Sequence, residues 1–422
     1  MNKRKSIFLS AISGNILEYY DFTVYAVFSL SIGRTFFPLD TQTIQALYSL
    51  SIFSVGFLMR PIGGIIFGYI ADRYGRRVSL VTSMIGMTAT TFIIGFIPSY
   101  IEIGFSAPVI LIIMRLMQGL CISGEGAGAA IFILEHYQNL RPGFTAGIVN
   151  ASNIAGTLLA SVVGIALEML FPDVDFAWRF AFILGGLMGI IGFYFRLKVS
   201  ETPVFTMLAQ NKRTLATPFN HVLRKSWPAM IVTFCLAGSA SSLVYIVKTY
   251  INIFYCEFMG FDKTTALIYL SYSSIIMMLT MPLSGYISDH IGRFKMIVIS
   301  SIAITTFSTP AFMLLACTTS SSQIIALTII AMLGGFIAGT AYIFIISLFS
   351  PEERFTGVAF SYNLGVALFG GTSAVISMWL VKVTQLYYAP AFYIMFTSCI
   401  FLVVVCCMRV TIRNLIDANL KP

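Results

Sequence analysis

The chain has 422 residues, of which 58% are hydrophobic and only 10% are charged. Its mean hydropathy is +0.88, which excludes a soluble protein of two or three domains and indicates an integral membrane protein. The net charge of +9 does not indicate a nucleic-acid partner, because the basic residues cluster in alternate loops rather than on one face.

Apolar stretches of roughly 18 to 25 residues recur from end to end, and each is long enough to cross a bilayer as a helix. Dividing the chain at charged or Pro/Gly-rich turns predicts twelve spans, near 8–33, 44–69, 79–98, 107–133, 144–170, 178–197, 228–255, 264–287, 296–316, 322–348, 357–381 and 390–408. Residues 198–226 are the only long polar interruption. We therefore expect an all-α protein with a six-helix bundle at 1–197, a cytoplasmic linker at 198–226 and a second six-helix bundle at 227–422.

The first span carries two acidic residues, Glu18 and Asp21, which share one helix stripe with Gly14 and Tyr25. A carboxylate inside a membrane is costly unless it faces a cavity, is paired or holds a proton. The pair is therefore a candidate proton site. The alternative is a structural salt bridge or cap near the cytoplasmic end. The aromatic residues around the pair could enclose a quaternary ammonium, although ordinary packing explains most of them.

A densely charged segment, Gly68–Arg77, follows the second span. Its arginines cannot cross a bilayer cheaply, so we expect a short turn on one membrane face, with Gly75 at φ > 0. A weaker copy lies at residues 285–295, offset by 289 − 72 = 217 residues. We predict an asymmetric cytoplasmic gate, stronger in the N-terminal half, in which Asp72 approaches Arg141. The gate residues are Gly68, Asp72, Arg73, Gly75, Arg76, Arg77, Arg141, Asp289, Gly292 and Arg293.

Arg115 and Gln118 lie on adjacent turns of the fourth span, and Glu125 returns to nearly the same face. A guanidinium there could bind a substrate carboxylate or lower the proton affinity of a neighbouring carboxylate. The alternative is a fixed ion pair between spans four and one. Arg60, which precedes Pro61, is expected to anchor the inner end of span two rather than to touch substrate.

On span seven, Ser241, Tyr245, Lys248 and Asn252 form another helix stripe. Lys248 either extends its ammonium to the membrane surface or supplies a second cation to an interior cavity. Seven scattered cysteines indicate neither a disulfide framework nor a metal site. No nucleotide-binding or catalytic motif is present, so we expect no cofactor, no metal and no enzymatic activity.

With the N-terminus inside, only Arg34, Arg179, Lys263 and Lys382 fall on the outer side of the membrane. The positive-inside rule therefore predicts that both termini are cytoplasmic. Arg141-Pro-Gly-Phe-Thr-Ala-Gly147 before span five is echoed by Arg354-Phe-Thr-Gly357 before span eleven. Two parallel copies of a six-span unit are the architecture of the major facilitator fold.

The sequence resembles the major facilitator superfamily, and within it the metabolite:proton symporters of bacteria. The motifs that carry the resemblance are Gly14-Asn15-Ile-Leu-Glu18-Tyr19-Tyr20-Asp21-Phe22, Arg60-Pro61-Ile-Gly63-Gly64, Asp72–Arg77, Arg115-Leu-Met-Gln118-Gly119 and Glu201-Thr202-Pro203-Val-Phe205. The match is densest over residues 14–205. It departs at Ser123-Gly124-Glu125, where the family often has two glycines before the glutamate. The resemblance implies alternating access and a role for Arg115 in proton coupling.

We therefore expect a monomeric, multi-pass transporter of the bacterial inner membrane that carries a small zwitterion, such as proline or betaine, together with a proton. A proton-coupled dicarboxylate permease (2-oxoglutarate-like), a drug or metabolite exporter and a non-transporting sensor are the alternatives. The expected proton-coupling residues are Glu18, Asp21, Glu125 and Arg115. The expected substrate-binding residues are Asn15, Tyr19, Tyr25, Arg115, Gln118, Tyr245 and Lys248.

Overall fold

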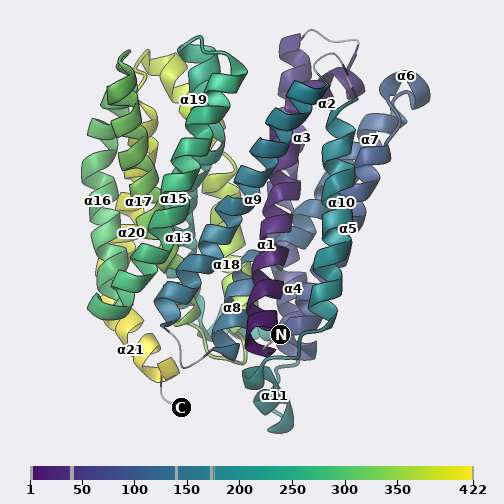
Figure 1. Ribbon diagram of the computed structural model, residues 1–422. Coiled ribbons are helices and arrows are strands. Elements are labelled where there is room, and N and C mark those ends of the chain that lie inside the picture. The colour runs from purple at the N-terminus through teal and green to yellow at the C-terminus, as the bar shows by residue number, and fades with distance from the viewer. Residues whose placement is uncertain (1–2, 39–41, 138–140, 172–173, 175, 421–422) are drawn as a thin grey trace.

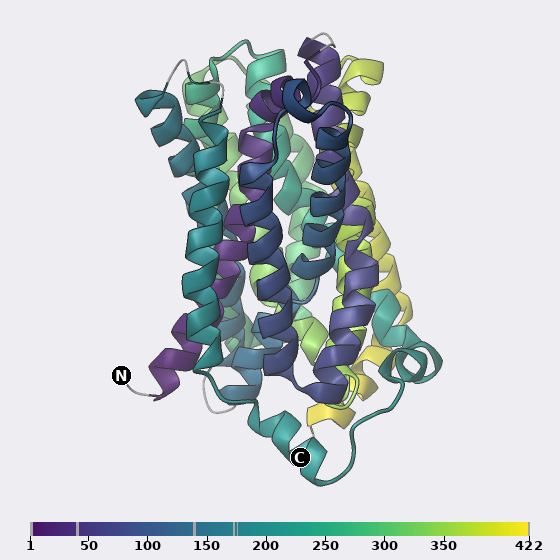
Figure 2. The same cartoon turned by 90° about the vertical axis from the view of Figure 1, so that its right-hand side faces the viewer.

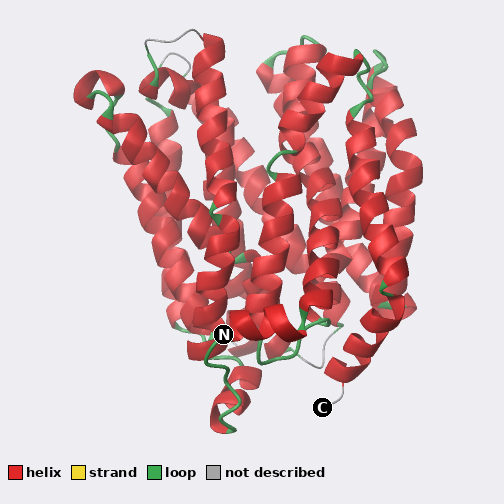
Figure 3. Ribbon diagram, turned by 180° about the vertical axis from the view of Figure 1, so that it is seen from behind, coloured by secondary structure: helices red, strands yellow, loops and turns green. Residues whose placement is uncertain are grey.

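The computed structural model describes residues 3–38, 42–137, 141–171, 174 and 176–420. Within these ranges the regular structure is helical and no strand occurs (Figure 3). The long helices run side by side along one direction (Figure 1). In a bilayer each backbone N–H and C=O must be paired within the protein, and long helices satisfy this requirement within each segment.

The N-terminal half (residues 1–197) and the C-terminal half (residues 227–422) each supply one group of helices. The first half contains α1 (Lys3–Val27), α2 (Ser29–Phe36), α3 (Gln42–Leu58), α4 (Arg60–Tyr74), α5 (Arg76–Phe96), α6 (Tyr100–Ile103), α7 (Ser106–Ile122), α8 (Gly126–His136), α9 (Pro142–Leu170) and α10 (Trp178–Leu197). Residues 198–226 contain α11 (Pro203–Gln210) and α12 (Pro218–Lys225). The second half contains α13 (Trp227–Tyr245), the π-helix η1 (Ile246–Tyr250), α14 (Ile251–Ile253), the π-helix η2 (Phe254–Phe258), α15 (Lys263–Ile291), α16 (Arg293–Leu315), α17 (Ser320–Ile346), α18 (Arg354–Gly365), the π-helix η3 (Val366–Gly370), α19 (Ser373–Thr384), α20 (Pro390–Cys407) and α21 (Arg409–Leu420).

Eleven helical segments in the described ranges are long and apolar enough to cross a membrane. The twelfth expected span is α1, which has 25 residues but contains Asn15, Glu18 and Asp21, and these polar residues lower its hydropathy. With α1 counted, the segments match the twelve predicted spans in order. The all-α, twelve-helix major facilitator fold is therefore confirmed.

The charged segment at the end of α4 forms a tighter turn than we expected. The helix continues through Asp72 to Tyr74, and α5 begins at Arg76. Gly75 alone reverses the chain, with φ 125°, and Gly292 does so in the second copy, with φ 97°. The positive φ predicted for Gly75 is thus confirmed. The turn is shorter than predicted because Asp72 and Arg76 are buried against other helices instead of lying in water.

Among the helix pairs that join the halves are α9 with α15 and α4 with α18, and glycines lie at both of these contacts. A Cβ at Gly64 would lie 2.7 Å from the carbonyl oxygen of Ala359, and one at Gly68 would lie 2.6 Å from the Cα of Thr356. Gly143 and Gly285 face each other in the same way across the other pair. The halves therefore approach backbone to backbone at these points.

Both termini lie at the same end of the molecule as α11, the lower end in Figures 1 and 2. We call this the linker end and the opposite end, which carries α2 and α6, the far end.

Candidate functional site

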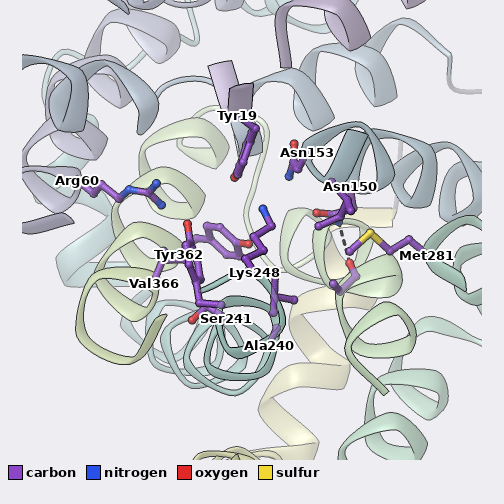
Figure 4. Close-up of a pocket in the computed structure, with 14 residues that line it drawn as sticks. Tyr19, Arg60, Asn150, Asn153, Ala240, Ser241, Lys248, Met281, Tyr362 and Val366 are labelled. Atoms are coloured by element: carbon purple, nitrogen blue, oxygen red, sulfur yellow. Dashed lines mark hydrogen bonds between the residues drawn. The ribbon is translucent and has the colours of Figure 1, made fainter. Parts of the chain in front are cut away.

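A cavity lies between the two halves. The residues that line it are Tyr19, Arg60, Asn150, Asn153, Ile154, Ala240, Ser241, Val244, Tyr245, Lys248, Met281, Ala338, Tyr362 and Val366. They come from α1, α4 and α9 of the first half and from six helical elements of the second, so motion of one half against the other would change its shape. We call it the central cavity (Figure 4).

The charges of the central cavity are all positive. Arg60 and Lys248 are 2% and 9% exposed, and no acidic side chain lines the cavity. The guanidinium of Arg60 lies over the rings of Phe22 and Phe57, at 4.8 and 4.5 Å from their centroids. Two cations without a carboxylate make the cavity a favourable place for an anionic group.

The position of Arg60 contradicts the expectation that it anchors the inner end of a span. The second span runs from α3 through α4 to Tyr74, so Arg60 lies near its middle. Pro61 occupies the first turn of α4, where its missing N–H leaves no hydrogen bond unmade. The span was predicted to end at residue 69, but α4 continues to Tyr74. Arg60 is therefore farther from the end of the span than expected.

Span seven presents three of its four predicted stripe residues to the central cavity. Ser241, Tyr245 and Lys248 line it, and Asn252 does not. Lys248 lies in the π-helix η1, where the extra residue per turn shifts the register of the side chains that follow. Its Nζ lies 4.4 Å from the ring centroid of Tyr19 and 5.7 Å from that of Tyr245. Lys248 thus faces the cavity and not the membrane surface.

Four of the predicted substrate-binding residues do not line the central cavity. Asn15 donates to the carbonyl of Val149 at 2.9 Å and ties α1 to α9. The other three lie within the first half, at Tyr25, Arg115 and Gln118. The Arg115 guanidinium packs 4.2 Å from the Tyr25 ring centroid and donates to Gln118 at 2.7 Å. A direct substrate contact for these four residues is therefore not supported in this conformation.

All three predicted proton-site carboxylates line one other, smaller cavity inside the first half. Glu18 and Asp21 reach it from α1, and Glu125 reaches it from the break between α7 and α8. Glu18 is 5% exposed, and neither of its carboxyl oxygens has a hydrogen-bond partner among the described residues. We call this group the carboxylate cluster.

A chain of hydrogen bonds connects the carboxylate cluster to Arg115. Thr91 donates to Asp21 at 3.0 Å, and Gln118 donates to Thr91 at 2.8 Å. Gln118 in turn accepts from Arg115. The predicted arginine and the predicted acid are therefore linked through two neutral side chains rather than by a direct ion pair.

Glu125 is paired with Arg196, a residue that the sequence analysis did not single out. Both side chains are buried, and a guanidinium Nη of Arg196 lies 2.8 Å from a carboxyl oxygen of Glu125. Gly14 of α1 gives the guanidinium room to pass. Arg196 lies next to the end of the predicted span six, and the last turn of α10 directs it inward. The spacing of Arg196 and Glu125 in the sequence does not indicate that they pair.

At the linker end, Asp72 of α4 contacts the N-terminus of α18 in the other half. Its carboxylate accepts from the backbone N–H of Phe355 at 3.3 Å and of Thr356 at 2.8 Å. Arg76 pairs with Asp72 at 3.1 Å. A helix N-terminus carries a partial positive charge, so a carboxylate there holds the two halves together.

Asp289 repeats this arrangement in the second half. It accepts from the N–H groups of Gly143 at 2.7 Å and Phe144 at 3.0 Å, at the N-terminus of α9. No ion pair within 4 Å is found for Asp289 in the described part of the chain. Arg293 interacts with it only at longer range, whereas Arg76 contacts Asp72 directly. The predicted partner of Asp72 is wrong, because Arg141 instead packs 4.7 Å from the ring centroid of Tyr286.

The remaining basic residues of the first turn contact the linker and the end of α10. Arg73 donates to the carbonyl of Ala216 at 3.2 Å, and Arg77 donates to that of Leu197 at 2.6 Å. Glu201 accepts from the backbone N–H groups of Arg76 and Arg77 and so caps α5. Partial burial raises the pKa of Glu201, against the lowering effect of these hydrogen bonds.

The linker also contacts the second half. Arg213 pairs with Glu352, and His221 lies 3.5 Å from Glu353. The hydroxyl of Ser226 donates to Glu353 as well. Burial raises the pKa of the Glu353 carboxyl, although Ser226 and His221 oppose the shift. Because Arg73 holds the same linker from the first half, residues 213–226 bridge the two halves at this end.

Comparisons with known proteins agree with this architecture. The family model described as Major Facilitator Superfamily matches residues 11–374. The chain is 32% identical over 404 residues to a glycine betaine/proline/ectoine/pipecolic acid transporter of Dickeya dadantii, with 93% of this chain and 80% of that protein covered. It is 29% identical over 420 residues to a proline/betaine transporter of Escherichia coli K12, with 97% and 84% covered.

Among solved structures, a proton:xylose symporter bound to 6-bromo-6-deoxy-D-glucose superposes with a TM-score of 0.75, covering 97% of this chain and 96% of that one. At 16% sequence identity this likeness concerns the fold alone. The helices, the central cavity and the sequence matches lead to one assignment: the chain belongs to the major facilitator superfamily, and it is a membrane transporter rather than an enzyme.

Proposed function

We propose that the protein carries a small zwitterion of the proline or betaine type, together with a proton, by alternating access. The observation that carries this proposal is the central cavity, where Arg60 and Lys248 face three tyrosines and no acidic residue. The cations suit a substrate carboxylate, and the tyrosine rings suit a substituted ammonium. The names of the similar transporters, which include proline and betaine, support the same class of solute.

The carboxylate cluster is the proposed proton site. Glu125 is neutralised by Arg196, and Asp21 is linked to Arg115 through Thr91 and Gln118. Glu18 has no hydrogen-bond partner for either oxygen among the described residues. An ionised carboxylate in such a place is strongly disfavoured, so Glu18 takes up the proton in this conformation. The proton and the solute thus bind at separate places.

In this scheme the two halves, 1–197 and 227–422, rock about the central cavity. The linker end, which we place in the cytoplasm, is held closed by Asp72, Asp289 and the bridging linker. The conformation is therefore the outward-facing side of the cycle, in which solute enters from the far end. The central cavity lies within a single chain, which supports a monomeric transporter, and the similarity to bacterial transporters supports a bacterial inner-membrane location.

A dicarboxylate permease is the second candidate, because two cations and no acid also suit two carboxylates. The tyrosines distinguish the candidates, since ring faces attract an ammonium but offer little to an anion. Proteoliposomes with an imposed pH gradient, tested with proline, glycine betaine and 2-oxoglutarate, decide between them. Accumulation of 2-oxoglutarate alone would contradict the proposed solute, and uptake that ignores the pH gradient would contradict proton coupling.

A further inference from the structure

We infer that Lys248 occupies, in the empty transporter, the place that the ammonium group of the solute takes when it binds. Its ammonium lies on the ring face of Tyr19, and a bound carboxylate draws it away and uncovers that face. This inference rests on the proposed function and adds to it an exchange of one cation for another within the central cavity.

The geometry of Lys248 is that of a cation held by aromatic rings. Its Nζ is 4.4 Å from the ring centroid of Tyr19 and 5.7 Å from that of Tyr245, within the roughly 6 Å range of cation–π attraction. No carboxylate lies within 4 Å of it in the described part of the chain, although Lys248 is only 9% exposed. A buried ammonium normally has an acidic partner. Here the ring of Tyr19 replaces that partner.

The neighbours of Lys248 explain why a solute would move it. Arg60 projects into the same cavity, and Figure 4 shows both cationic groups directed toward the space beside Tyr19. Two like charges without an acid repel each other and attract a carboxylate. A solute carboxylate forms a charge-assisted hydrogen bond with the ammonium, which is stronger than the ring contact that it replaces.

The lysine stem can make this movement without a change of the backbone. It has four flexible carbons, and its ammonium can turn from the ring of Tyr19 toward an anion in the cavity. The π-helix η1 directs the stem into the cavity, where Ser241 and Tyr245 of the preceding turns also face. The vacated ring face then accepts a quaternary ammonium, which cannot donate hydrogen bonds and is best held by such a surface.

This exchange makes the cavity select for both charges of a zwitterion. A solute with only a cation meets a covered ring and two repelling charges. A solute with only a carboxylate binds Lys248 but leaves the Tyr19 ring uncovered. A betaine satisfies both, so its two groups bind cooperatively although they contact different side chains.

The test measures equilibrium binding of glycine betaine, tetramethylammonium and acetate to the purified full-length protein in lipid nanodiscs. In Lys248→Met, betaine binding is expected to weaken at least about tenfold, because its carboxylate loses a partner. Tetramethylammonium binding is expected to strengthen by about 5- to 30-fold, because the ring of Tyr19 is uncovered. Lys382→Met, at an exposed lysine of α19, serves as the matched control and should change the binding of neither betaine nor tetramethylammonium.

The ring is tested in the Lys248→Met background. Adding Tyr19→Phe should retain the gain in tetramethylammonium binding, and adding Tyr19→Leu should remove it. A Lys248→Met protein that binds tetramethylammonium no better than the unaltered protein overturns the exchange, even if betaine binding falls. If the Met variant does not fold, Lys248→Gln is measured in its place with the same criterion. Failure of the unaltered protein to bind betaine would instead refute the proposed solute.

Discussion

Replacing Asp72 by Asn should open the linker end more than the same change at Asp289. In Asp72→Asn the two backbone N–H groups of α18 lose a charged acceptor, and Arg76 loses an ion-pair partner. Hydrogen bonds to a charged group contribute about 1.5–3 kcal/mol, against about 0.5–1.5 for neutral ones, and the charge at a helix N-terminus adds up to about 2.

The amide oxygen of the new Asn can still accept one hydrogen bond, and Arg76 keeps Glu135 at 3.4 Å. We therefore expect a loss of about 2–3 kcal/mol, which shifts the closed-to-open ratio of the linker end by about 30- to 150-fold. Asp289→Asn also takes a charged acceptor from two backbone N–H groups but disrupts no ion pair within 4 Å among the described residues, so its expected loss is about 1–2 kcal/mol.

The populations can be measured by electron–electron resonance between spin labels at the exposed residues Tyr74 and Ile291, one in each half, after replacement of the exposed cysteines. Asp417→Asn, at an exposed position of α21, is the control. Transport should slow in Asp72→Asn while the order of preference among solutes stays the same. Equal shifts in the two variants, or a larger one in Asp289→Asn, would refute the asymmetry.

Three further predictions concern buried or partly buried charges. Glu18→Gln should abolish proton-driven accumulation in proteoliposomes but spare counterflow exchange, and persistent accumulation would remove Glu18 from the proton site. Arg196→Gln leaves Glu125 buried without its cation and should destabilise the protein by about 3–5 kcal/mol, which a lower melting temperature would show. The double variant Arg196→Leu with Glu125→Leu should recover most of the lost stability. The raised pKa of Glu353 means that this carboxyl binds its proton more tightly when the linker is docked against it than when the linker is free. Docking should therefore strengthen as the pH falls from above that raised pKa toward about 4.3. Hydrogen exchange of α12, corrected for the intrinsic pH effect, should slow as the pH falls through this range, and faster exchange would contradict the assignment.

The order and number of the spans could be predicted because a membrane helix must be long and apolar, and this property is local in the sequence. The stripe of Glu18 and Asp21 was also informative, since both side chains reach one cavity. A stripe shows which residues share a face but not what that face meets. Arg115 and Gln118 share a face as predicted, yet that face meets Thr91 and Tyr25 rather than the central cavity.

Other features depend on contacts between distant segments and left no local pattern. α4 continues past its predicted end because α18 shields Asp72. As a result, Arg60 lies near the middle of the span instead of near its end. The π-helix η1 turns Lys248 into the cavity while Asn252 falls outside it, which a uniform 3.6-residue period does not anticipate. The pairing of Arg196 with Glu125 joins residues 71 positions apart.

The backbone-to-backbone contacts at Gly64, Gly68, Gly143 and Gly285 have a mechanical consequence. These glycines carry no side chain that would interlock with the other half, so they offer no steric obstacle when the surfaces part. Resistance to opening then comes from polar contacts, namely the carboxylates at the helix N-termini, the bridging linker and the ion pair of Glu135 with Arg354. A bulky residue at Gly68 would leave Asp72 chemically intact and yet act as a wedge, separating the steric contribution to closure from the electrostatic one.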